Sequence, residues 1–140
     1  MDYGKDQAEE LLDYVVSFAE ELLAKYGEFF PFGGAIDRTG KLVSVAAYEG
    51  REMPPSDALI ETLAQGLRAS AANGDYIASA LVYDALVVPP GSTDKSDAIV
   101  AELEHREGFA MTVYFPYKIE GGQPEFAATF GTAAKRDIFV

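Results

Sequence analysis

The chain has 140 residues, with 23 acidic and 11 basic side chains and a formal net charge of −12 at pH 7. This charge repels nucleic-acid phosphates and anionic lipid headgroups, so we expect neither nucleic acid nor a membrane among its partners. The lack of cysteine excludes disulfides and thiolate metal sites, and a hydrophobic content of 49% predicts one folded domain over residues 1–140.

The N-terminal residues have neither the basic stretch nor the apolar run of a signal peptide, so we expect a cytoplasmic protein. A first helix is predicted from the capping-box spacing of Asp6 and Glu9 to Gly27, which is a natural helix stop. A helical wheel separates an apolar core face from a solvent face. The acidic residues of that solvent face are Asp6, Glu9, Glu10, Asp13, Glu20 and Glu21.

A hairpin and a second helix follow. Residues 34–37 and 41–48 flank a three-residue loop that ends in Gly40, which places Asp37 opposite Lys41. After Pro54-Pro55, Ser56 is a plausible cap for a helix that ends at Asn73-Gly74. Its apolar stripe consists of Ile60, Leu63, Ala64, Leu67 and Ala71.

The remainder reads as strands. Residues 76–88 are long and apolar with little alternation, which predicts a central strand covered on at least one face. Residues 98–105 and 109–118 form a second hairpin, and pairing His105 with Phe109 places the apolar residues of both strands on one face. A last strand is predicted over residues 125–130.

The predicted fold is α+β, in the order αββαββββ. It is a two-layer sandwich in which two helices pack on one face of an antiparallel sheet of five to six strands. This element order resembles that of roadblock and longin domains, and more loosely that of profilin and PAS domains. It differs from roadblock domains in ending on a strand where they add a helix. The resemblance implies a fold and no function.

A candidate pocket involves Tyr83, Asp84 and His105. Asp84 interrupts an apolar strand, where a buried carboxylate needs a partner or a shifted pKa, so it is either a pocket residue or a structural anchor. Tyr83 is its neighbour, and His105 is the only histidine and stands beside a bulged turn. The aromatic run of residues 29–32 is either core packing or part of this pocket.

The sequence contains no assembled catalytic motif. Glu102 and Glu104 share a strand face and could hold a cation, but such a pair is more often a solvated surface. The glycine pair after Phe32 opens a strand, whereas a phosphate loop leads into a helix. We therefore expect no catalytic residues, no metal and no cofactor.

These observations favour a small acidic cytoplasmic protein of bacterial type that acts as a non-enzymatic interaction module. One concrete form is an immunity or antitoxin-like inhibitor that binds a basic protein partner through Glu9, Glu10, Asp13, Glu20 and Glu21. The alternatives are a small-molecule sensor with the pocket described above, and an enzyme using His105 or a carboxylate pair. An apolar patch around Val100 and Tyr114 would favour a homodimer. Plain solubility explains the acid excess equally well.

Overall fold

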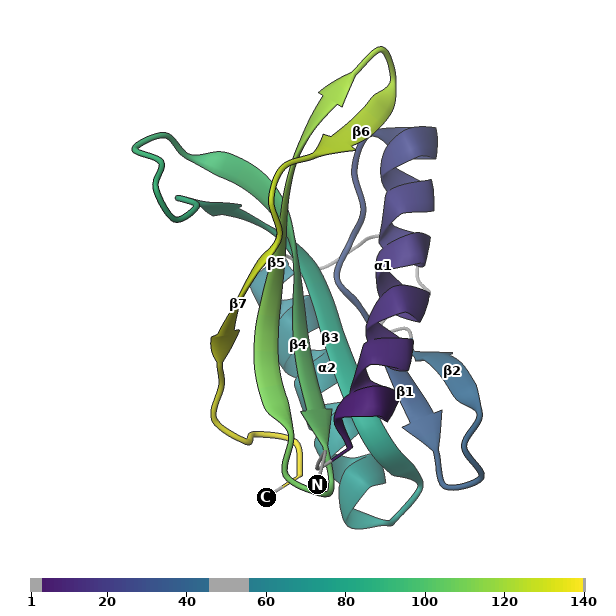
Figure 1. Cartoon of the computed structure of the whole chain (residues 1–140). Coiled ribbons are helices and arrows are strands. Elements are labelled where there is room, and N and C mark those ends of the chain that lie inside the picture. The colour runs from purple at the N-terminus through teal and green to yellow at the C-terminus, as the bar shows by residue number, and fades with distance from the viewer. Residues whose placement is uncertain (1–3, 46–55, 140) are drawn as a thin grey trace.

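The computed structural model describes residues 4–45 and 56–139, which form two helices and seven strands (Figure 1). The elements follow one another as α1 (Lys5–Tyr26), β1 (Phe32–Asp37), β2 (Leu42–Val45), α2 (Ser56–Ala72), β3 (Tyr76–Val87), β4 (Ser96–His105), β5 (Ala110–Glu120), β6 (Gln123–Phe126) and β7 (Phe130–Ala133). The predicted strand residues 46–48 and the break at Pro54-Pro55 lie outside the described residues. The α+β class is confirmed.

One antiparallel sheet runs in the order β2-β1-β3-β4-β5, and both β6 and β7 pair with the outer edge of β5. The single last strand predicted over residues 125–130 is therefore two strands. Tyr117 lies opposite Phe126 and Tyr114 opposite Phe130, so the outer chain carries one residue more than β5 between these pairs. The irregularity lies beside Pro116, which has no N–H to donate and accepts a bond from the Ala127 amide at 2.9 Å.

The predicted register of the β4–β5 hairpin is confirmed. Leu103 lies opposite Met111, Ala101 opposite Val113 and Ile99 opposite Phe115. The His105 amide donates to the Phe109 carbonyl at 2.8 Å and closes the turn. The alternation of apolar and polar residues on both strands fixed this register, because a slip by one residue would turn every side chain to the other face.

The first hairpin also has the predicted pairing, since the Asp37 amide donates to the Lys41 carbonyl at 2.9 Å. The Asp37 carboxylate stabilises the turn between the two strands. It accepts bonds from the Thr39 hydroxyl at 2.6 Å, the Thr39 amide at 2.9 Å and the Lys41 amide at 3.0 Å. These donors, the Thr39 hydroxyl above all, lower the pKa of Asp37.

The two helices lie against opposite faces of the sheet, a detail in which the structure differs from the predicted packing on one face. Gly33 and Gly34 are successive residues of β1, so their Cα–H groups point to opposite sides. A Cβ on Gly34 would lie 2.5 Å from Val15 Cγ1 of α1, whereas one on Gly33 would lie 3.7 Å from Leu63 Cδ2 of α2. Figure 1 shows α1 in front of the strands and α2 behind them.

The central strand β3 explains this arrangement. Its residues Ala78, Ala80 and Val82 belong to the core that contains the buried side of α1, whereas Leu81 packs with α2. A strand covered on both faces is apolar throughout, which is why residues 76–88 show so little alternation. The sheet is thus a middle layer, and each helix has its own hydrophobic core.

The ends of α1 depart in part from the sequence-based expectation. Gly27 stops the helix in a left-handed conformation, as predicted, and its amide donates to the Leu23 carbonyl at 2.8 Å. The prediction of a capping box formed by Asp6 and Glu9 is wrong, because the helix begins at Lys5, after Gly4, and has no side-chain cap. Gly4 has a φ of 87°, and a Cβ there would overlap the His105 ring. Close packing of the ring on the backbone therefore requires glycine at this position.

Candidate functional site

The acidic side of α1 is exposed along the length of the helix. Its acidic ridge, defined as Glu9, Glu10, Asp13, Glu20 and Glu21, consists entirely of exposed residues. In the described ranges 4–45 and 56–139, the ion pairs include one member of this ridge, Glu9, which pairs with Lys5 at 3.9 Å. Within these ranges, the other four carboxylates are exposed and form no ion pair.

Two aromatic side chains flank the acidic ridge on the side of β1 and β2. Tyr14 is 37% exposed and its hydroxyl bonds to the Ser44 hydroxyl at 2.8 Å. Phe18 is 39% exposed and its ring centroid lies 5.0 Å from that of Phe32. Both rings are held in place by the neighbouring strands, so the ridge combines fixed aromatic surface with negative charge.

Tyr83, Asp84 and His105 do not line one pocket. Tyr83 and Asp84 are successive residues of β3, so Tyr83 points to the side of α2 and Asp84 to the side of α1. His105 shares the face of Asp84 but pairs with Ala78, six residues away along β3, which corresponds to roughly 20 Å. The structure therefore gives each of the three a separate environment.

Tyr83 and Glu102 form a pair on the α2 side of the sheet. The Tyr83 hydroxyl donates to Glu102 Oε2 at 2.5 Å. Burial raises the pKa of Tyr83, and the bond to the carboxylate raises it further, because ionisation would place two negative charges together. Tyr83 is therefore a hydrogen-bond donor that holds the Glu102 carboxylate.

Asp84 is anchored on the α1 side by Tyr117, whose hydroxyl donates to Asp84 Oδ2 at 3.0 Å. Asp84 is exposed and not buried as expected, but partial desolvation by its neighbours raises its pKa, with a further rise from the charge of Asp97, while the Tyr117 bond acts in the opposite direction. Burial and the neighbouring Asp84 raise the pKa of Tyr117 as well. The structural-anchor interpretation of Asp84 accounts for this contact, although the side-chain partner is a tyrosine and not an arginine.

His105 is 2% exposed and holds the start of α1 against the sheet. Its Nδ1 accepts a bond from the Glu107 amide at 3.0 Å, and its Nε2 lies 2.6 Å from Gln7 Oε1. An Nδ1 that accepts carries no proton, so the neutral ring donates from Nε2 to the Gln7 carbonyl oxygen. Both ring nitrogens thus have partners within the fold, in keeping with a structural role beside the turn.

Glu104 is the functional group whose role the sequence did not reveal. It is 7% exposed, and its carboxylate accepts the backbone N–H groups of Asp137 and Ile138 at 3.0 Å and of Phe139 at 3.3 Å. The pair formed by Glu102 and Glu104 is therefore not an open cation site, because protein donors occupy both carboxylates. No local pattern could indicate this, since the three donors lie 33 to 35 residues further along the chain.

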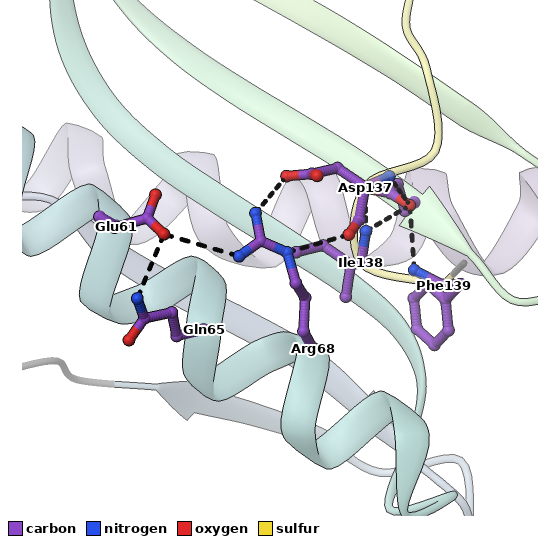
Figure 2. A network of polar contacts seen from close by, with 7 residues as sticks. Glu61, Gln65, Arg68, Asp137, Ile138 and Phe139 are labelled. Atoms are coloured by element: carbon purple, nitrogen blue, oxygen red, sulfur yellow. Dashed lines mark hydrogen bonds and ion pairs between the residues drawn. The ribbon is translucent and has the colours of Figure 1, made fainter.

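Arg68 of α2 secures the same C-terminal segment from the other side (Figure 2). Its Nη2 lies 2.7 Å from Asp137 Oδ2, and its Nε donates to the Asp137 carbonyl at 3.1 Å. Glu61 approaches Arg68 Nη1 at 3.7 Å and accepts a bond from Gln65 at 3.3 Å. The segment is thus fixed by a buried carboxylate on β4 and by a guanidinium on α2.

A hollow of about 530 Å³ lies beside this segment. It is lined by Arg68, Ala71, Ala72, Arg136, Ile138 and Phe139. A smaller hollow of about 250 Å³ lies near the β5–β6 hairpin and includes Tyr117 and Phe126 in its lining. Neither hollow was indicated by the sequence.

The other predicted surfaces are largely packed inside the fold. Phe29 is buried with its ring centroid 5.9 Å from that of Phe32, so core packing accounts for this part of the aromatic run. Val100 is 1% exposed, and Tyr114 stacks on Phe130 at 4.6 Å. The patch that would have favoured a homodimer is therefore covered in part by the chain itself.

Over the described residues, no group of three or more histidine or acidic side chains is placed to hold a metal ion. Neither helix of this part of the chain is long and apolar enough to cross a membrane. Comparison with known proteins found no family model, curated protein or solved structure that matches the chain.

Proposed function

We propose that the protein is a non-enzymatic interaction module whose acidic ridge on α1 binds a basic protein partner, in the manner of an immunity or antitoxin-like inhibitor. The observation that carries this proposal is the row of five exposed carboxylates on one helix, of which only Glu9 is in an ion pair within the described residues. Residues 6–24 contain six acids and no lysine, arginine or histidine. A surface of this kind attracts a cationic protein over roughly 8 Å at physiological salt and accelerates its capture.

Charge alone gives attraction without a defined orientation. Tyr14 and Phe18 add the apolar contact that stable interfaces place at their centre, where aromatic residues contribute most of the binding energy. Both rings are already positioned by Ser44 and Phe32, so little conformational freedom is lost when a partner covers them. The flank of α1 that faces β2 is therefore the predicted centre of the interface, with the acidic ridge at its edge.

The proposal is tested by capture from native lysate with a matched pair of charge variants. The double variant Asp13→Lys/Glu20→Lys reverses two of the charges of the acidic ridge. Glu120→Lys with Glu125→Lys makes the same change in net charge at exposed positions of the β5–β6 hairpin. We expect a basic protein to be captured at low salt by the wild type and by the hairpin variant, and to be lost from the ridge variant.

The salt dependence provides a second criterion. Added salt should weaken the capture steeply, because the pairs involved are exposed and screened. Equal loss from both variants would show that only the total charge matters. The proposal would be contradicted if the amount of captured protein did not fall with added salt, or if the captured protein were not basic.

A further inference from the structure

The larger hollow has the size and construction of a ligand site. It lies where α2 ends in the small residues Ala71 and Ala72, and where Ile138 and Phe139 pass beside the helix. Its volume of about 530 Å³ lies within the range of about 300–1,000 Å³ that is usual for small-molecule sites. Ile138 and Phe139 are held in position by their amide bonds to Glu104, so this wall of the hollow is already formed.

Two arginines line this hollow, although the chain as a whole has a net charge of −12. Arg68 is oriented by Asp137, which occupies its Nε and Nη2, while its Nη1 faces the exposed Glu61 at the longer distance of 3.7 Å. Arg136 donates to the Arg106 carbonyl at 3.1 Å and is in no ion pair with an acid of the described residues. Arg68 is thus paired with two acids, whereas Arg136 has no carboxylate partner among the described residues.

The remaining lining is apolar. Ala71, Ala72, Ile138 and Phe139 provide methyl groups and one ring, which offer no hydrogen bond to a second polar group of a ligand. Guanidinium groups bind carboxylates well, because two parallel N–H donors match the two oxygens. A small inorganic anion would use the arginines and leave the apolar walls without contact.

We propose that this hollow binds a small apolar monocarboxylate, such as a short- or medium-chain fatty acid. Its carboxylate lies on Arg136, and its hydrocarbon chain lies on Ala71, Ile138 and Phe139. A ligand in this position bridges α2 and the C-terminal segment, so it stabilises the folded protein in proportion to its concentration. This site is independent of the acidic ridge.

Isothermal titration calorimetry of the full chain with butyrate, hexanoate and octanoate tests the proposal. We expect binding that tightens by about fourfold for each added CH₂, since each buried methylene contributes about 0.8 kcal/mol. Hexanamide, which has the same chain without the charge, and inorganic phosphate, which has the charge without the chain, should bind at least tenfold more weakly than hexanoate.

Two variants locate the site. Arg136→Gln should weaken the binding of octanoate at least tenfold. Arg38 is an exposed arginine of the β1–β2 turn, and Arg38→Gln should leave the affinity for octanoate unchanged. Ala72→Leu keeps both arginines but fills the hollow, so it should also weaken the binding of octanoate. The proposal is overturned if millimolar octanoate does not bind, if hexanamide or phosphate binds as well as hexanoate, or if the two arginine variants behave alike.

Discussion

The buried carboxylate of Glu104 offers the sharpest test of how this fold is held together. We consider the substitution Glu104→Gln, which keeps the shape of the side chain and removes its charge. One amide oxygen remains to accept a bond, but the new NH₂ group would face backbone N–H groups that are themselves donors. The C-terminal segment would therefore lose most of its anchoring.

The magnitude follows from the three N–H groups that the carboxylate accepts. A hydrogen bond to a charged group contributes about 1.5–3 kcal/mol net. If the amide retains roughly half of the interaction, the free energy of unfolding falls by about 3 kcal/mol. For a chain of this size that corresponds to a decrease in Tm of about 10 °C.

Urea denaturation, together with hydrogen exchange of the Asp137, Ile138 and Phe139 amides, measures the effect. Glu102→Gln is the matched control on the same strand face, since its amide oxygen can still accept the Tyr83 hydroxyl. We expect the control to lose about 1 kcal/mol or less and to keep the three amides protected. If Glu104→Gln is no more destabilising than this control and leaves those amides protected, the anchoring role is refuted.

Three further outcomes follow from particular contacts. Gly34→Ala should destabilise by about 1–3 kcal/mol in urea denaturation, because its Cβ would lie 2.5 Å from Val15 Cγ1, and Val15→Ala should recover part of the loss. Gly131→Ala should change stability far less, because the obstructing atom is the end of a flexible methionine side chain. Gly66→Ala should raise the free energy of unfolding by up to about 1 kcal/mol, since it removes a glycine from the interior of α2 with open space around it. Asp84→Asn should slightly stabilise the protein at neutral pH, because partial desolvation raises the folded-state pKa of Asp84 and ionisation therefore opposes folding above that pKa. This gain should shrink as the pH falls through the raised pKa and vanish well below the ordinary value of 3.8. A gain that grew on acidification would contradict the direction of the shift.

Local patterns predicted the strand pairing better than they predicted the layers. The β4–β5 register could be read from the sequence because its two faces differ in polarity from residue to residue. The placement of α2 could not, because β3 is apolar on both faces and its pattern does not say which side each helix covers. The glycine pair at residues 33–34 held the missing information, since one glycine faces each helix. The two glycines could be interpreted in this way only once it was known which helix lies against each face of β1.

The candidate sites also differ in whether a local sequence pattern could predict them. The acidic ridge could be predicted because a helical wheel needs only the sequence of one helix. The role of Glu104 could not, because a strand carboxylate anchored by a distant backbone looks the same in sequence as one exposed to water. Arg68 and Arg136 likewise lie 68 residues apart in the chain and meet at one hollow only through the tertiary fold.

The position of the Glu104 partners also bears on synthesis of the protein. A chain that emerges from the ribosome presents β4 well before residues 137–139, so the Glu104 carboxylate has no backbone donors from that segment while the sheet assembles. Burying an uncompensated charge is costly, so this end of β4 should stay hydrated until the segment arrives. Closure on the α2 side is thus expected to be a late event of folding, whereas the α1 side contains elements that are already complete.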